Sequence, residues 1–171
     1  FSTSTDSVGA AIFYRDVPLM PSETETGVVK PLAGDALHLI SWRIHGISSD
    51  EAPVVMSDMP TCANCHSFSH DGASVGMDMD GPRGDKGAYA LRDIEDSMVI
   101  RQGDVFSWND FNPSQTTFGL FSRVSPDGRY AVSSVDEEVF VANYTDYRFL
   151  QTFYPTRGKL AVFSRKTRAI T

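Results

Sequence analysis

The residues best suited to do chemistry are two cysteines and a histidine, which lie within five consecutive positions as Cys62, Cys65 and His66. They include the chain's only two cysteines, and the Cys-X-X-Cys-His spacing is that of a c-type haem attachment motif. In such a motif two thiols reach the two vinyl groups of one porphyrin, and the imidazole reaches the iron. The segment therefore predicts one covalent haem c, held by Cys62 and Cys65, with His66 as the proximal iron ligand.

Two other chemistries use the same residue types. A zinc site needs two further Cys or His ligands at metal spacing, and His70 lies four positions after His66. The turn-forming pair Asp71-Gly72 argues against a helix that would place both imidazoles on one face. A redox-active dithiol is the second alternative, because Cys-X-X-Cys also occurs in disulfide oxidoreductases.

The second axial position of the iron has several candidates. Methionine there raises the reduction potential, histidine lowers it, and an open position permits ligand binding. Met77 is the first choice, because the alternation of residues 73–80 places Val75, Met77 and Met79 on one strand face close after the motif. The further candidates are Met79, His70, Met59, Met56, His38 and His45. The competing interpretation is core packing for each methionine and a surface position for each histidine.

Other constellations are weaker. Six carboxylates surround a glycine-rich loop and offer oxygen ligands of the kind that calcium prefers, although solvated turns explain them more simply. They are Asp78, Asp80, Asp85, Asp93, Glu95 and Asp96. The sequence contains no nucleotide-binding glycine motif and no Ser-His-Asp order. With the haem motif as the main signal, we expect an electron carrier more than a catalyst.

Composition limits the class of protein. Hydrophobic residues make up 41% of the chain and charged residues 22%, as in a globular protein. The formal net charge of -7 argues against nucleic acid as a partner, because phosphate binding needs clustered Lys and Arg. No apolar run reaches the roughly 20 residues of a membrane span, so no transmembrane segment is expected in this chain.

The elements expected around the motif are strands. Segments rich in apolar and β-prone residues, bounded by turn signals, lie at 8–14, 37–46, 53–56, 73–80, 88–93, 97–102, 129–135, 138–144, 149–153 and 160–164. At most a short turn is expected at the haem motif, and another near 110–115. One phrase occurs twice before a strand, as Ser69-His70-Asp71-Gly72 and as Ser125-Pro126-Asp127-Gly128. Asp-Gly supplies the positive-φ position of a tight turn, so the sequence predicts two similar turns.

From about residue 40 onward the sequence resembles bacterial TolB-like β-propeller proteins that carry a c-type haem motif. The matching residues are Cys62-Ala63-Asn64-Cys65-His66-Ser67-Phe68-Ser69, Asp71-Gly72, Gly76-Met77-Asp78, Asp80 and Asp85-Lys86-Gly87, preceded by Trp42-Arg43-Ile44, Ile47-Ser48-Ser49 and Pro53-Val54-Val55. The resemblance implies an all-β fold of propeller blades with an inserted haem-binding segment. It also implies an exported protein, periplasmic or extracellular.

We therefore expect residues 1–171 to form one propeller-like haem domain, with the haem-binding segment at about 56–80 and blade-like units at about 68–105 and 120–171. Some three blades fit in this length, whereas a closed propeller needs at least four, so we expect a partial propeller and a longer natural chain.

The expected function is that of a mono-haem c-type cytochrome that transfers single electrons. Open sheet edges need covering, which favours a subunit of a larger respiratory, photosynthetic or extracellular cytochrome assembly. Two alternatives stay open at this point. One is a propeller scaffold with a structural haem, and the other is a haem enzyme or sensor with an open iron site.

Overall fold

The computed structural model describes residues 5, 9–20, 22, 24, 26–29, 33–59, 61, 63–119, 121–143 and 151–171. The described chain is mostly β, with three small antiparallel sheets ordered β1-β2-β3, β4-β5-β6-β7 and β10-β9-β8. It divides into two compact units, Phe1–Cys62 with Glu95–Val99 and Ala63–Ile94 with Ile100–Thr171. Among the described residues, no helix is long and apolar enough to cross a membrane.

The first unit contains β1 (Ala11–Asp16), β2 (Ser41–Gly46) and β3 (Val54–Met56), with a 3-10 helix η1 (Gly34–Leu39) before β2. Trp42 is 1% exposed and its ring stacks on Phe13 of the neighbouring strand, with ring centroids 5.1 Å apart. Aromatic cross-strand pairs of this kind stabilise a small sheet. The expected strand at 37–46 begins only at Ser41, because its first residues form η1.

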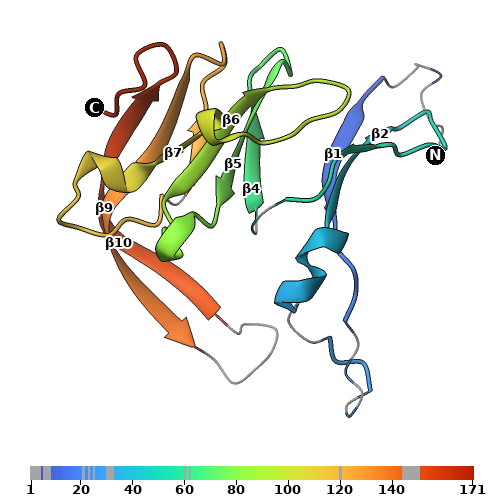
Figure 1. Cartoon of the computed structure of the whole chain (residues 1–171), viewed down its shortest axis with the longest axis horizontal. Helices are drawn as coiled ribbons and strands as arrows, with labels where there is room; N and C mark the ends of the chain where they lie inside the picture. The colour runs from blue at the N-terminus through green and yellow to red at the C-terminus, as the bar shows by residue number, and fades with distance from the viewer. Residues whose placement is uncertain are drawn as a thin grey trace. The chain divides into compact units, whose positions relative to one another are not determined.

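The second unit begins with a four-stranded antiparallel meander, whose strands are labelled β4 to β7 in Figure 1. Its strands are β4 (Ala63–Phe68), β5 (Ser74–Met79), β6 (Ala88–Asp93) and β7 (Val105–Ser107). The predicted alternation of β5 is confirmed, since Val75, Met77 and Met79 share one face and are at most 6% exposed. Short 3-10 helices η2 (Pro82–Gly84), η3 (Gln102–Asp104) and η4 (Trp108–Phe111) connect or follow the strands. The strand expected at 97–102 is not formed.

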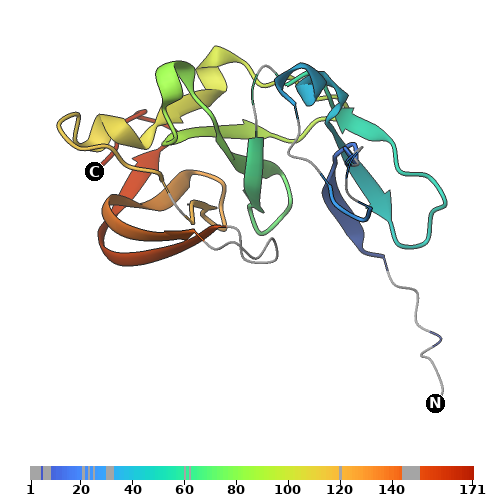
Figure 2. The same cartoon turned by 90° about the horizontal axis from the view of Figure 1, so that it is seen from below.

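The third sheet contains β8 (Arg123–Val124) and two long strands, β9 (Tyr130–Asn143) and β10 (Gln151–Ser164), coloured orange to red in Figures 1 and 2. The last residues of the chain return along β10. Phe163 forms a bridge with Ile170, and the Val162 amide donates to the Thr171 carbonyl at 2.8 Å. The sheet therefore repeats the up-and-down path of β4 to β7.

The strands expected at 129–135 and 138–144 form one continuous strand, β9, to Asn143, and Tyr144 lies outside the described residues. The two acids Asp136 and Glu137 interrupt the apolar pattern, yet the chain does not turn there. The β9–β10 pairing is irregular at this point instead. Asp136 has a φ of 50°, and the register with β10 shifts nearby. Its carboxylate accepts from Lys159 Nζ at 2.6 Å, while Glu137 accepts from the hydroxyl of Thr117. These bonds satisfy two buried acids without ending the strand.

The strands expected at 149–153 and 160–164 likewise merge into β10, and residues 149–150 lie outside the described part.

The two sheets of the second unit share one hydrophobic core. Tyr89 and Leu91 of β6 and Trp108 of η4 pack with residues of the other sheet, namely Val124, Ala131, Val135, Ala161 and Phe163. The Phe106 and Phe163 rings stack with centroids 3.6 Å apart. Gly76 permits this approach, since a Cβ there would lie 2.6 Å from Val124 Cγ2.

The two Ser-X-Asp-Gly phrases form the same turn. Ser69 Oγ donates to Asp71 Oδ1 at 2.6 Å, and Ser125 Oγ donates to Asp127 Oδ1 at 2.7 Å. Each serine oxygen also accepts the amide of the residue five positions later, Ser74 or Tyr130, at 2.9 and 3.0 Å. The predicted pair of similar turns is confirmed, and each turn joins two antiparallel strands, β4 to β5 and β8 to β9.

Candidate functional site

The start of β4 carries the described part of the Cys-X-X-Cys-His motif; Cys62 lies outside the described residues. Cys65 is an exposed free thiol, and Asn64 beside it is also exposed. Ala63 lies opposite Met79 and His66 lies opposite Met77, so β4 has one more residue than β5 between these pairs. This extra residue makes a bulge. The motif was expected at a short turn, and the structure places its described part in a bulged strand instead.

His66 is half-buried, and its environment favours the neutral imidazole. Desolvation by burial lowers the pKa of His66, a hydrogen bond with the Asn64 backbone opposes that shift, and the nearby charge of Arg123 adds to it. Neutral imidazole is the form that binds metals. Ligating histidines commonly bond a backbone carbonyl through their other ring nitrogen, so the contact with Asn64 suits a ligand.

The candidate second ligands occupy different surroundings. Met77 is 0% exposed, and its Cα faces that of His66 across the β4–β5 ladder, so both side chains leave the same face from neighbouring positions. Met79 is 6% exposed on that face. His70 is exposed in the first turn. Met59 is 7% exposed and belongs to the other unit. The structure thus brings His66 and Met77 together, side by side rather than facing each other across a gap.

The types of donor suit a haem, because an exposed thiol directly precedes a half-buried imidazole. The arrangement of these donors on β4 does not suit it. Adjacent residues of a strand point to opposite faces of the sheet, so Cys65 and His66 diverge. One porphyrin bonded to Cys65 and bound through iron to His66 does not fit β4 in its strand conformation.

The acidic residues of the glycine-rich region serve as hydrogen-bond acceptors for the chain itself. Asp80 pairs with Lys86 Nζ at 2.6 Å. Asp85 Oδ1 accepts the Gly87 amide at 2.9 Å and Asn109 Nδ2 at 2.6 Å. Within the part of the chain that the structure describes, no group of three or more His, Cys, Asp or Glu side chains is arranged to hold a metal ion.

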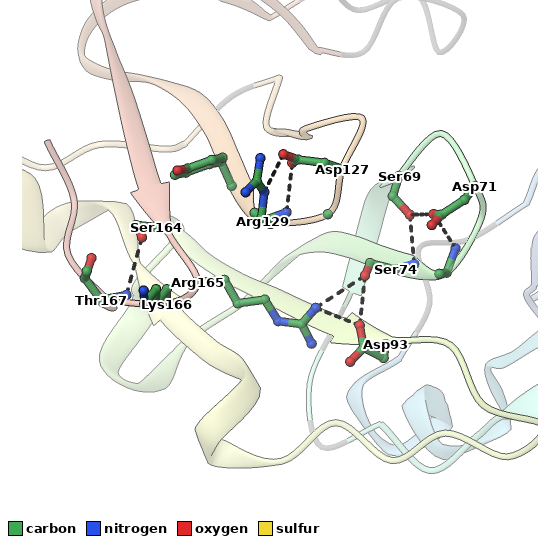
Figure 3. Close-up of a pocket in the computed structure, with 13 residues that line it drawn as sticks. Ser69, Asp71, Ser74, Asp93, Asp127, Arg129, Ser164, Arg165, Lys166 and Thr167 are labelled. Atoms are coloured by element: carbon green, nitrogen blue, oxygen red, sulfur yellow. Dashed lines mark hydrogen bonds and ion pairs between the residues drawn. The ribbon is translucent and has the colours of Figure 1, made fainter.

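A polar cavity of about 610 Å³ lies between the two repeated turns and the turn after β10 (Figure 3). Arg165 Nη1 reaches from the third turn to Asp93 Oδ1 at 2.6 Å and Ser74 Oγ at 3.3 Å. Its hydrogen bond to Asp93 is the main reason that the pKa of this carboxyl is lowered. The two repeats are also joined directly, since the His70 amide donates to the Pro126 carbonyl at 2.8 Å.

The charges of this cavity are largely neutralised by the chain itself. Arg129 pairs with Asp127 at 2.6 Å within the second turn. The Ser125 hydroxyl is the largest cause, ahead of Arg129, that lowers the pKa of Asp127 to about 2. Sequence reasoning did not find this cavity, although the two repeated phrases mark two of its walls. The hydrogen bonds and ion pairs of the residues that line the cavity connect the two repeated turns and the turn after β10.

Comparison with protein-family models, with curated proteins and with solved structures finds no match for this chain. The assignment of function therefore rests on the chemistry of the residues described above.

Proposed function

We propose that the chain is a mono-haem c-type cytochrome that passes single electrons between redox partners. The observation that supports this most directly is the Cys-X-X-Cys-His spacing of Cys62, Cys65 and His66, in which Cys65 is an exposed thiol. A bound haem would supply an iron that changes by one electron between ferrous and ferric states.

In this proposal Cys62 and Cys65 attach the haem and His66 is the proximal ligand. The two cysteines would hold the haem by thioether bonds to its vinyl groups, and the imidazole would be an iron ligand from the protein.

The proposal extends to the architecture and its setting. The two repeated meanders would be adjacent blades of a TolB-like propeller, which is consistent with their common core and identical turns. The resemblance of the sequence to exported haem-containing propellers favours the periplasm or the cell exterior. The expected partners are redox proteins or other subunits of a respiratory, photosynthetic or extracellular cytochrome assembly.

The test is to export the full chain in a bacterial host that attaches haem c, then measure intact mass and the pyridine haemochrome spectrum. We expect the added mass of one haem in the wild type and none in the Cys62→Ser/Cys65→Ser double variant. His70→Ala is the control that keeps its haem, because His70 is exposed in a turn outside the motif. A wild-type chain that gains no haem mass contradicts the proposal.

A redox titration separates electron transfer from the alternatives. A reversible one-electron transition with low-spin spectra supports the carrier. A haem that does not cycle would indicate a structural haem in a scaffold, and a high-spin ferrous haem that binds carbon monoxide would indicate an enzyme or sensor.

A further inference from the structure

The cavity between the two repeated turns and the turn after β10 has the size of a small-molecule site (Figure 3). Its volume of about 610 Å³ lies within the roughly 300–1,000 Å³ of ligand pockets. Ser69, Ser74 and Gly128 are its buried lining residues, whereas Tyr130 and Lys166 are exposed. Most small-molecule pockets are lined mainly by apolar side chains, but hydroxyls, carboxylates and basic groups predominate in this one. A ligand of this cavity should therefore be polar.

We propose that this cavity binds a neutral mono- or disaccharide. The inference goes beyond the proposed function, because every residue that lines the cavity lies outside the segment from Cys62 to His66. It adds a binding site for a hydroxyl-rich ligand that haem attachment neither requires nor predicts.

Arg165 and Asp93 present a hydrogen-bond donor and an acceptor side by side. Arg165 Nη1 donates to Asp93 Oδ1 at 2.6 Å and to Ser74 Oγ at 3.3 Å, and Ser74 Oγ donates to the same carboxylate oxygen at 2.8 Å. Within the described part of the chain, these bonds leave Asp93 Oδ2 and Arg165 Nη2 unused. A carboxylate only accepts and a guanidinium only donates, whereas a hydroxyl does both. Neighbouring sugar hydroxyls can therefore donate to Asp93 and accept from Arg165 while the ion pair stays intact.

The arrangement of charges disfavours an ionic ligand. Asp127 pairs with Arg129 at 2.6 Å, and Asp93 pairs with Arg165 at 2.6 Å. A bound anion would lie close to carboxylates and a bound cation close to guanidinium groups, and like charges repel. Hydroxyl groups meet no such penalty. The formal charges that line the cavity balance, since they come from Asp71, Asp93, Asp127, Arg129, Arg165 and Lys166.

Tyr130 adds an aromatic surface to this polar lining. The residue is 40% exposed, and the guanidinium carbon of Arg129 lies 5.9 Å from its ring centroid. A tyrosine combines an apolar ring with a hydroxyl that forms hydrogen bonds. A sugar can use both parts, because its ring carries C–H groups as well as hydroxyls. An inorganic ion has no use for the apolar part.

The walls of the cavity are held in place by bonds within the chain. Ser69 Oγ accepts the Ser74 amide at 2.9 Å and donates to Asp71 Oδ1 at 2.6 Å. The second turn has the same bonds, and the His70 amide joins the two turns through the Pro126 carbonyl at 2.8 Å. A site that is already ordered loses little conformational freedom when a ligand binds. The polar groups can therefore contribute to affinity despite their partial exposure.

The experiment is an NMR titration of the full ¹⁵N-labelled chain with glucose, galactose, N-acetylglucosamine, maltose and cellobiose. We expect at least one of these sugars to shift the amide signals of Ser74, Tyr130 and Arg165 saturably in the millimolar range. The amide of Trp42, in the other unit, should not move. Glycine and inorganic phosphate are the zwitterionic and anionic probes. If either of them shifts these amides and no sugar does, the proposed class of ligand is wrong. If no probe shifts them, the cavity is not a binding site for such a ligand.

Variants show whether binding takes place in the cavity. Arg165→Gln removes a donor and should weaken sugar binding about tenfold. Arg157→Gln is the matched control, because Arg157 also pairs with a carboxylate, that of Glu138, but lies in β10 outside the cavity. Ala73→Trp should abolish binding, since Ala73 is an exposed lining residue where added volume fills the cavity without removing a polar side chain. Equal affinities of R165Q and R157Q, or wild-type affinity in folded A73W, overturn the inference.

Discussion

His66 lies directly opposite Met77 in the β4–β5 ladder. The second meander has serines at the two equivalent positions, and there Ser122 Oγ donates to Ser133 Oγ at 2.9 Å. The repeated scaffold therefore places a cross-strand pair at this site in both copies. Only the first copy carries an imidazole and a thioether there, next to the cysteine motif, so the chemistry of the chain is concentrated in one of two similar sheets.

Met77 should act as a core residue and not as an iron ligand. Met77→Leu conserves volume and is expected to lower the free energy of unfolding by less than about 1.5 kcal/mol. Met77→Ala leaves a cavity at a fully buried position and should cost about 2–5 kcal/mol. Urea unfolding of the haem-free chain measures both values.

The visible spectrum of the haem-bearing M77L variant is the matching readout. We expect its absorption bands and spin state to equal those of the wild type. Loss of a low-spin spectrum in M77L, with stability nearly unchanged, would show that Met77 binds the iron after all.

The packing of the two repeated turns can be measured with a pair of glycines. Gly72 and Gly128 occupy the same turn position with φ of 70° and 69°. A Cβ at Gly72 would meet nothing within 4 Å, whereas one at Gly128 would lie 2.9 Å from Ser74 Oγ. Gly72→Ala should therefore cost about 1–2 kcal/mol from backbone strain alone. Gly128→Ala should cost about 1–3 kcal/mol more, because the alanine also displaces Ser74. Equal losses in thermal or urea unfolding would mean that the turns do not pack as described.

The sequence predicts well where a local pattern decides the structure. The alternation of Val75, Met77 and Met79 correctly predicts β5, and the two Ser-X-Asp-Gly phrases correctly predict two matching turns. Both depend on residues within a few positions of one another. Propeller closure and haem attachment remain predictions, because they depend on more than these local patterns.

The sequence is a poor guide to structure that depends on residues far apart along the chain. Asp136 and Glu137 interrupt the apolar pattern, yet β9 continues because Lys159 and Thr117, far along the chain, satisfy the two acids. The motif was expected at a short turn, whereas its described residues from Ala63 onward belong to β4, which pairs with β5. The cavity beside Arg165 depends on three turns that only the folded chain brings together.

Arg165 should link the two meanders, and its loss should be visible in the titration of Asp93. Arg165→Gln removes the main cause of the lowered pKa of Asp93, so this pKa should rise toward its ordinary value in a carboxyl ¹³C NMR titration. A carboxylate with a lowered pKa stabilises the fold above its unfolded-state pKa, and this contribution disappears as pH falls through the folded-state value. The pair is partly exposed, so the loss near neutral pH should be below about 1 kcal/mol.

Arg129→Gln is the comparison for this variant, because Arg129 pairs with Asp127 inside one turn and is 74% exposed. It should leave the pKa of Asp93 unchanged. If R129Q and R165Q raise the pKa of Asp93 by the same amount, the shift comes from the loss of one positive charge in general. It then does not depend on the hydrogen bond between Arg165 and Asp93.

Asp78 should make the chain less stable as pH rises. Burial raises the pKa of Asp78 from 3.8 to about 6, against the opposing effects of the Ser122 hydroxyl and the Arg123 charge. The folded state therefore binds this proton more tightly than the unfolded state, and stability should fall between about pH 4 and pH 6. Asp78→Asn cannot ionise and should remove this slope. The side chain is only half-buried, so we expect a gain of about 1 kcal/mol at pH 7, well below the full value of the shift.

The measurement is urea unfolding of the haem-free chain at several values between pH 4 and pH 8. Asp80→Asn is the matched control, because Asp80 lies two positions away but is exposed and paired with Lys86. It also removes one negative charge and should keep the wild-type slope. If D78N keeps the wild-type slope of stability against pH as well, the carboxyl that loses its proton in this range lies elsewhere in the chain. That result would also mean that burial of Asp78 between β4 and β6 does not raise its pKa.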